Sequence, residues 1–148
     1  MKIAIGCDHA ACEYKVMVRE YLLENGYEVV DEGIEKGEKA DYPDIAEKVG
    51  LRVASGECEK GILICGTGIG MSIAANKVNG VRAAVVSDPY SARLCRAHND
   101  ANILCFGQRV VGSEVALELV KAFLATEHEG GRHAGRVAKI MAIEGRQK

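Results

Sequence analysis

The chain has 148 residues, of which 48% are hydrophobic and 27% are charged, and its formal net charge is −2 at pH 7. This length suits one domain with a real core, and we predict a single domain over residues 1–148. The near-neutral charge, without a dense block of Lys and Arg, argues against nucleic acid as a partner. No apolar stretch approaches the ~20 residues of a membrane span, so we expect no membrane association.

The N-terminus and the cysteines indicate where the protein works. A strand pattern begins at Lys2, which leaves no room for a signal peptide. The six cysteines show neither a CxxC pair nor the spacing of a zinc site. We therefore expect free thiols in a reducing cytoplasm, with no disulfide and no metal centre.

Strand and helix patterns alternate along the chain without a linker. The predicted strands are 2–6, 27–30, 61–65, 81–86 and 103–106. The predicted helices are 12–25, 41–55, 70–77, 88–98, 113–124 with Ser113 as its cap, and one that follows Gly130-Gly131. This alternation predicts an α/β fold: a three-layer α/β/α sandwich around a five-stranded parallel, Rossmann-like sheet, with an extended C-terminal helix.

Residues 61–73 are the most informative segment. An apolar run that is typical of a buried strand ends on Cys65, and glycines follow at 66, 68 and 70 before a helix. A turn of this kind directs free backbone N–H groups to the start of a helix, which suits an anion. The same setting lowers the pKa of a thiol, so the segment offers both a base or nucleophile and a cradle for negative charge. The plainer alternative is an ordinary turn with a buried, inert cysteine.

Polar side chains follow four of the predicted strands. They are Asp8-His9, Cys65-Gly66-Thr67, Ser87-Asp88 and Gln108-Arg109. The carboxyl ends of parallel strands share one edge, where open α/β sheets bind their ligands. We therefore expect a site at this edge, which makes an inert Cys65 the weaker alternative.

Other ligand classes fit the glycine turn less well. A dinucleotide fingerprint needs its third glycine at position 71, where Met71 stands, and no Gly-Lys-Ser/Thr follows for a P-loop. A phosphatase loop would place an arginine six residues after Cys65, which is again Met71. Near the C-terminus, Arg132 and Arg136 share one helix face, which suits a phosphate.

Seven motifs together resemble the ribose-5-phosphate isomerase B family, nearly from end to end. They are Cys7-Asp8-His9, Asp41-Tyr42-Pro43, Ile64-Cys65-Gly66-Thr67-Gly68-Ile69-Gly70, Asp88-Pro89-Tyr90-Ser91-Ala92, Arg96-Ala97-His98-Asn99-Asp100, Phe106-Gly107-Gln108-Arg109 and Glu129-Gly130-Gly131-Arg132-His133. The resemblance implies an aldose–ketose isomerase that interconverts ribose 5-phosphate and ribulose 5-phosphate through an enediolate. Isomerases of allose 6-phosphate and galactose 6-phosphate are similar, so a six-carbon substrate is an alternative, and a non-catalytic sugar-phosphate sensor is another.

The resemblance also implies roles for single residues. Cys65 would be the base, His98 would assist ring opening, and Thr67 would help to orient that step. The remaining expected substrate-binding residues are Asp8, His9, Gly66, Gly68, Ile69, Gly70, Asn99, Arg109, Arg132 and Arg136. Neither cofactor nor metal is implied.

The family forms two-fold dimers with active sites between subunits. We therefore expect a homodimer, in which dimers can pair into tetramers. Arg132 and Arg136, together with Asn99 or His9, are expected to serve the partner's site.

Overall fold

The computed structural model describes residues 1–147, and Lys148 lies outside the described residues. Five parallel strands form one sheet in the order β2-β1-β3-β5-β4. Their bounds are β1 Lys2–Cys7, β2 Glu28–Asp31, β3 Lys60–Cys65, β4 Ala83–Val85 and β5 Ile103–Gly107. The helices are α1 Cys12–Glu24, α2 Tyr42–Ala54, α3 Ile69–Ala75, α4 Pro89–Ala97, α5 Ser113–Ala125 and α6 Arg132–Gly145.

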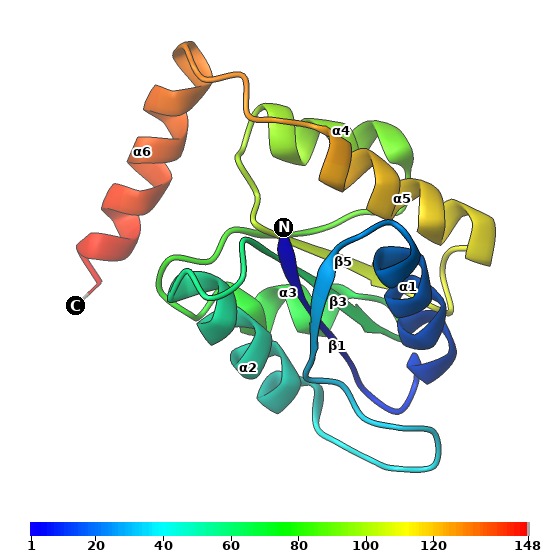
Figure 1. Ribbon diagram of the computed structural model, residues 1–148. Coiled ribbons are helices and arrows are strands. Elements are labelled where there is room, and N and C mark those ends of the chain that lie inside the picture. The colour runs from blue at the N-terminus through cyan, green and yellow to red at the C-terminus, as the bar shows by residue number, and fades with distance from the viewer. Residues whose placement is uncertain (148) are drawn as a thin grey trace.

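The sheet carries helices on both faces, which confirms the three-layer prediction (Figure 1). Alternate residues of the central strands point to opposite faces. Ile62 and Ile64 pack with α1, α4 and α5, whereas Leu63 and Cys65 pack with α2 and α3. Strands that are apolar on both faces are typical of a parallel sheet that helices cover on both sides.

Element boundaries differ from the predictions at a few places. The strand predicted over 81–86 is confined to β4, and α3 begins at Ile69 rather than at residue 70. Gly112, not Ser113, is the N-cap of α5, and no side-chain hydrogen bond caps that helix. The Ser113 prediction was wrong because the hydroxyl residue begins the helix instead of preceding it.

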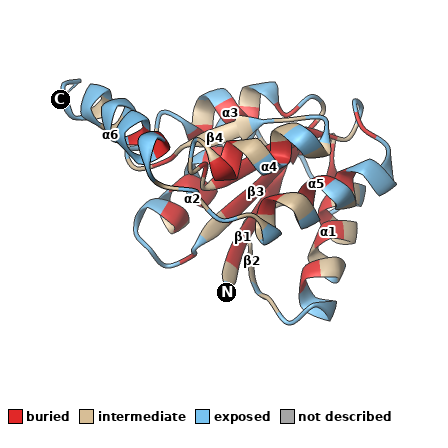
Figure 2. Cartoon of the chain, turned by 90° about the horizontal axis from the view of Figure 1, so that it is seen from above, coloured by how far each residue is buried: buried red, intermediate tan, exposed pale blue. Residues whose placement is uncertain are grey.

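The C-terminal helix α6 extends away from the three layers (Figure 1). Most of its surface is exposed, with His133 and Val137 as its buried residues (Figure 2). Gly80 N–H donates to the Glu144 carboxylate at 3.0 Å, and an Arg82 guanidinium N–H donates to the Met141 sulfur at 3.4 Å. Among residues 1–147, no helix is long and apolar enough to cross a membrane.

Candidate active site

A pocket opens where the sheet changes its direction of winding. The chain adds β2 on one side of β1 and then β3 on the other, so β1 and β3 flank the switch point at which α/β sheets bind ligands. Asp8 follows β1 there and Cys65 ends β3. The pocket, of about 510 Å³, is lined by Asp8, His9, Ala10, Tyr42, Cys65, Gly66, Thr67, Ile69, Gly70, Ile73 and Arg109.

Cys65 is held by the turn that follows it. Its side chain is 6% exposed, and the Gly68 N–H donates a hydrogen bond of 3.0 Å to its sulfur. Gly68 adopts φ +81°, and a Cβ at this position would lie 2.7 Å from the backbone of Phe106. Only glycine fits this left-handed and crowded position, so the turn brings an N–H donor to the sulfur.

The other pocket residues are fixed by the backbone around them. Asp8 is buried and accepts a hydrogen bond of 2.9 Å from the Ala10 N–H. The Arg109 N–H donates to the Gly66 carbonyl at 3.1 Å, which places Arg109 beside the glycine turn. Thr67 Oγ1 accepts from the Ile69 N–H at 3.2 Å, and the Thr67 side chain remains exposed to the pocket.

Other cysteines are poorer candidates for a base. Burial raises the pKa of Cys7 to about 12 and that of Cys95 to about 11. Burial also raises the pKa of Cys58 and of Cys105. These four thiols therefore stay protonated near neutral pH. Cys65 lines the pocket, and its sulfur accepts a hydrogen bond from a backbone N–H.

Not all residues that follow the strands belong to the pocket. Asp88 caps α4 by accepting from the Ser91 N–H at 2.8 Å, and Gln108 accepts from the Tyr14 N–H at 3.0 Å. Both side chains serve local structure. Tyr42 lines the pocket without a predicted role: a Cβ on Gly70 would lie 2.5 Å from its ring, so the two are in close contact. In the sequence, Tyr42 belongs to the Asp41-Tyr42-Pro43 motif, one of those that carry the family resemblance.

The second group of predicted site residues lies at the opposite edge of the sheet. His98 and Asn99 follow α4, and Asn102 just beyond them accepts from Gly61 N–H at the start of β3. Cys65 ends the same strand, and six residues of strand span roughly 17 Å. One chain therefore does not bring His98 or Asn99 to the Cys65 pocket. His9 lines the same pocket as Cys65 in its own chain and so lies apart from His98 and Asn99.

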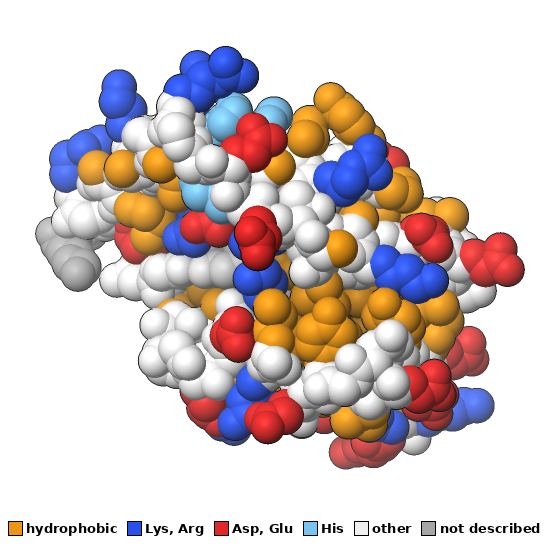
Figure 3. All heavy atoms as spheres, turned by 45° about the horizontal axis from the view of Figure 1, so that its top comes forward, with side chains coloured by type: hydrophobic (Ala, Val, Ile, Leu, Met, Phe, Trp, Pro, Cys, Tyr) orange, Lys and Arg blue, Asp and Glu red, His pale blue; other side chains and the backbone are white. Residues whose placement is uncertain are grey.

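Arg132 and Arg136 belong with His98 rather than with Cys65. Both side chains are exposed on α6, four residues apart. The His98 ring stacks on the His133 ring next to Arg132, with centroids 4.0 Å apart and planes 7° apart. Basic side chains and histidines gather where α6 begins, at the upper left of Figure 3. This second group therefore offers cationic side chains and an imidazole.

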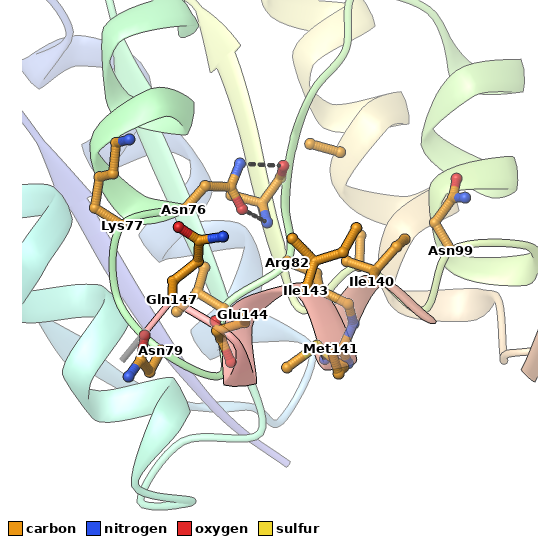
Figure 4. A pocket seen from close by; sticks show the side chains of 14 residues that line it. Asn76, Lys77, Asn79, Arg82, Asn99, Ile140, Met141, Ile143, Glu144 and Gln147 are labelled. Atoms are coloured by element: carbon orange, nitrogen blue, oxygen red, sulfur yellow. Dashed lines mark hydrogen bonds between the residues drawn. The ribbon is translucent and has the colours of Figure 1, made fainter. Parts of the chain in front are cut away.

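A cavity of about 670 Å³ lies between α6 and the body of the domain (Figure 4). Ile140 and Ile143 of α6 line it and are 45% and 51% exposed. Asn99 lines the same cavity, and Asn76 there exchanges hydrogen bonds of 2.9 and 2.8 Å with the Ala83 backbone. Apolar side chains thus remain uncovered close to the second group of site residues.

The fold and the pocket are typical of α/β proteins that bind small ligands at the carboxyl edge of a parallel sheet. A family model described as Ribose/Galactose Isomerase matches residues 3–140. The chain belongs to this family and is an isomerase.

Three relatives support this membership. Ribose-5-phosphate isomerase B of Escherichia coli K12 is 55% identical over 146 residues, which cover 99% of this chain and 98% of the relative. The solved structure of ribose-5-phosphate isomerase B from Clostridium thermocellum matches with a TM-score of 0.98 at 53% identity, over all of both chains. The enzyme from Mycoplasma genitalium, solved with bound ribulose-5-phosphate, matches with a TM-score of 0.93 at 41% identity, over 97% of this chain and 95% of that one.

Proposed function

We propose that this protein interconverts ribose 5-phosphate and ribulose 5-phosphate, with Cys65 as the base. The observation that carries the proposal is the position of Cys65, which lines the pocket at the switch point and whose sulfur accepts a hydrogen bond of 3.0 Å from the Gly68 N–H. The Gly68 N–H is therefore placed to donate a hydrogen bond to a thiolate, which is the form able to remove a proton. The relatives that carry the same activity in their names cover nearly the whole chain.

The proposed reaction begins with ring opening. The C1 hydroxyl gives its proton to solvent water as the bond between C1 and the ring oxygen breaks, and the ring oxygen takes a proton from His98, which solvent then protonates again. Thr67, exposed in the pocket, orients this step. The Cys65 thiolate then takes the proton from C2, which leaves an enediolate with its charge on the C1 oxygen. The proton of the C2 hydroxyl passes to the C1 oxygen, and the Cys65 thiol returns its proton to C1, which gives the ketose.

Charge that develops in the enediolate needs donors in place beforehand. Gly66, Thr67, Ile69 and Gly70 of the glycine turn line the pocket. The backbone N–H groups of the 66–70 turn are proposed to stabilise the enediolate oxygen, as an oxyanion hole does. Asp8, His9 and Asn99 are proposed to hold sugar hydroxyls, and Arg109, Arg132 and Arg136 the phosphate. Neither a metal nor a redox cofactor takes part in this mechanism.

We further propose a homodimer whose two sites each combine both groups of residues. Within one chain, the length of β3 separates Cys65 from His98, and this distance is greater than the length of a five-carbon sugar phosphate. A two-fold partner would bring the second group of one subunit to the pocket of the other. The exposed Ile140 and Ile143 and the uncovered cavity beside α6 support a partner at this surface. All six cysteines are free, which supports a reducing cytoplasm as the place of action.

The decisive experiment compares Cys65→Ala with Cys95→Ala on a panel of five- and six-carbon aldose phosphates. Both cysteines are 6% exposed, so the two changes remove equally buried sulfur atoms. Cys65→Ala is expected to lower kcat by at least about 10³-fold, because the base is lost. Cys95→Ala should turn over almost normally.

Each outcome separates the alternatives. If the unmodified protein has its highest kcat/KM on a six-carbon aldose phosphate, that sugar phosphate and not ribose 5-phosphate is the preferred substrate. Tight binding of ribose 5-phosphate without turnover of any sugar would favour a sensor. Activity of Cys65→Ala within tenfold of the unmodified protein would contradict the assignment of the base.

A further inference from the structure

Two residues without a role in the proposed reaction meet the ring of His98. Glu129 Oε2 lies 3.8 Å from His98 Nε2, and Glu129 Oε1 lies 3.6 Å from His133 Nε2. The two imidazole rings are stacked in parallel. One carboxylate thus spans the Nε2 atoms of two stacked rings.

The backbone holds this arrangement together across two elements. The Glu129 N–H donates to the Ala97 carbonyl at 2.9 Å, and the His128 ring lies 3.0 Å from the same carbonyl through Nδ1. The His133 N–H donates to the Gly130 carbonyl at 3.0 Å. The segment before α6 is therefore fastened to the end of α4, directly beside His98.

The geometry suits a shared proton better than a metal ion. Possible ligand atoms of His98, Glu129 and His133 lie within 4.8 Å of one another. However, the lone pairs of imidazole nitrogens lie in the ring planes, and these planes are 7° apart. The lone pairs therefore run side by side instead of converging on one point, as a tetrahedral ion requires.

The surrounding charges decide which ring carries the proton. Burial, followed by the charges of His98 and Arg132, lowers the pKa of His133. Arg136 also opposes a proton on His133, whereas Glu129 favours one. His133 is thus a neutral ring near neutral pH, and two imidazolium rings at stacking distance would repel each other.

The charged groups at the end of α4 are otherwise paired. Arg96 contacts the Asp100 carboxylate at 2.8 Å, and Arg82 contacts it at 3.3 Å. Among residues 1–147, Glu129 is the one acidic side chain that forms an ion pair with His98. Glu129 is therefore the carboxylate that can stabilise a protonated His98.

We propose that Glu129 and His133 are positioning residues for His98: His133 supports the ring face, and Glu129 keeps the proton on the His98 ring. This inference rests on the proposed role of His98 as the proton donor in ring opening. Glu129 is 57% exposed, so solvent screening limits its effect. Replacing Glu129 by Gln, which removes this charge, is therefore expected to have a measurable but limited effect.

The test is an NMR titration of the full-length protein labelled with ¹³C-histidine. The chain has four histidines, and His98→Asn identifies the His98 signal. In Glu129→Gln the midpoint of His98 should fall, and the high-pH limb of turnover on cyclic ribose 5-phosphate should move to lower pH by the same amount. KM and proton exchange on the open-chain ketose phosphate should change little. His133→Ala should lower kcat on the cyclic sugar by about tenfold, because the ring support is lost.

Glu127→Gln is the matched control, because it makes the same chemical change two residues away on an exposed side chain. It should move neither the midpoint nor the pH profile. An unchanged His98 midpoint in Glu129→Gln would overturn the inference whatever the activity. A lowered midpoint with an unchanged pH profile would leave the pairing intact and remove His98 from the proposed ring-opening step.

Discussion

At the residue scale, Gly68 links the conformation of one turn to the environment of the Cys65 sulfur. Gly68→Ala must accept both a left-handed backbone, at φ +81°, and a Cβ 2.7 Å from Phe106. We expect a loss of about 2–4 kcal/mol in the free energy of unfolding, since a backbone contact cannot relax cheaply. Turnover should also fall, because the Gly68 N–H moves away from the sulfur.

Gly26→Ala provides the matched control for this change. Gly26 has φ +83°, nearly the same backbone conformation, but nothing lies within 4 Å of its Cβ position. Gly26→Ala should lower the free energy of unfolding by only about 1 kcal/mol and leave kcat unchanged. Urea unfolding of the two variants isolates the steric contribution. Equal losses would show that the contact with Phe106 relaxes freely.

Some site residues could be predicted from the sequence because of one geometric rule. Asp8 and Arg109 follow strands and Cys65 ends one. Because parallel strands end at a common edge, the strand pattern alone predicts that these residues lie in one pocket. Glu129 and His133 could not be identified as partners of His98 in this way. Their contact depends on how the segment before α6 packs on α4, which is a tertiary property without a local pattern.

At the scale of elements, a buried ion pair joins α1 to β2. Lys15 is fully buried and its ammonium lies 3.0 Å from the Asp31 carboxylate, which Arg19 also contacts at 2.6 Å. Burial opposes ionisation of Asp31, but hydrogen bonds from Lys15, the Gly33 N–H and Arg19 outweigh it and hold the Asp31 pKa below its usual value. The pair therefore stabilises the fold above about pH 4, and this contribution is lost as the pH falls through the lowered pKa.

Lys15→Met should lower the free energy of unfolding by about 2–4 kcal/mol at pH 7, because it leaves the partly buried Asp31 carboxylate with a single cationic partner. Arg19→Met should cost less, about 1 kcal/mol or below, since Arg19 is partly exposed. Denaturant unfolding between pH 7 and pH 3 checks both values. The difference between Lys15→Met and the unmodified protein should shrink on acidification, and a difference independent of pH would assign the loss to packing alone.

The order of elements was less predictable than their existence. The alternation of patterns predicted five strands and their helices, yet the insertion of β5 between β3 and β4 has no signal in the chain. Likewise, α4 carries His98 from the carboxyl edge of the sheet to the opposite edge. A residue that ends a helix lies a full strand length from one that ends a strand. The motifs of His98 and Cys65, which are proposed to act together, are therefore not adjacent within one chain.

At the scale of the whole molecule, the separation of the two residue groups leads to a mixing experiment. Cys65→Ala and Arg132→Ala should each be inactive or nearly so as pure proteins. When their subunits exchange, about half of the dimers are mixed, and each mixed dimer has one site with both defects and one with neither. Activity should therefore reappear. Exchange verified by mass spectrometry without recovered activity would place both groups in the same subunit's site.

The loose attachment of α6 to its own domain has a consequence for assembly. Under the proposed arrangement, a bound sugar phosphate contacts both subunits, through Arg132 and Arg136 of one and Arg109 of the other. The ligand therefore contributes to the interaction between the subunits. Ligand concentration then controls the monomer–dimer equilibrium, because ligand binds the dimer and not the separated chains. At 100 times the dissociation constant, each occupied site would favour association by about 2.7 kcal/mol. A dilute enzyme would thus assemble when its substrate accumulates and come apart when the substrate is consumed.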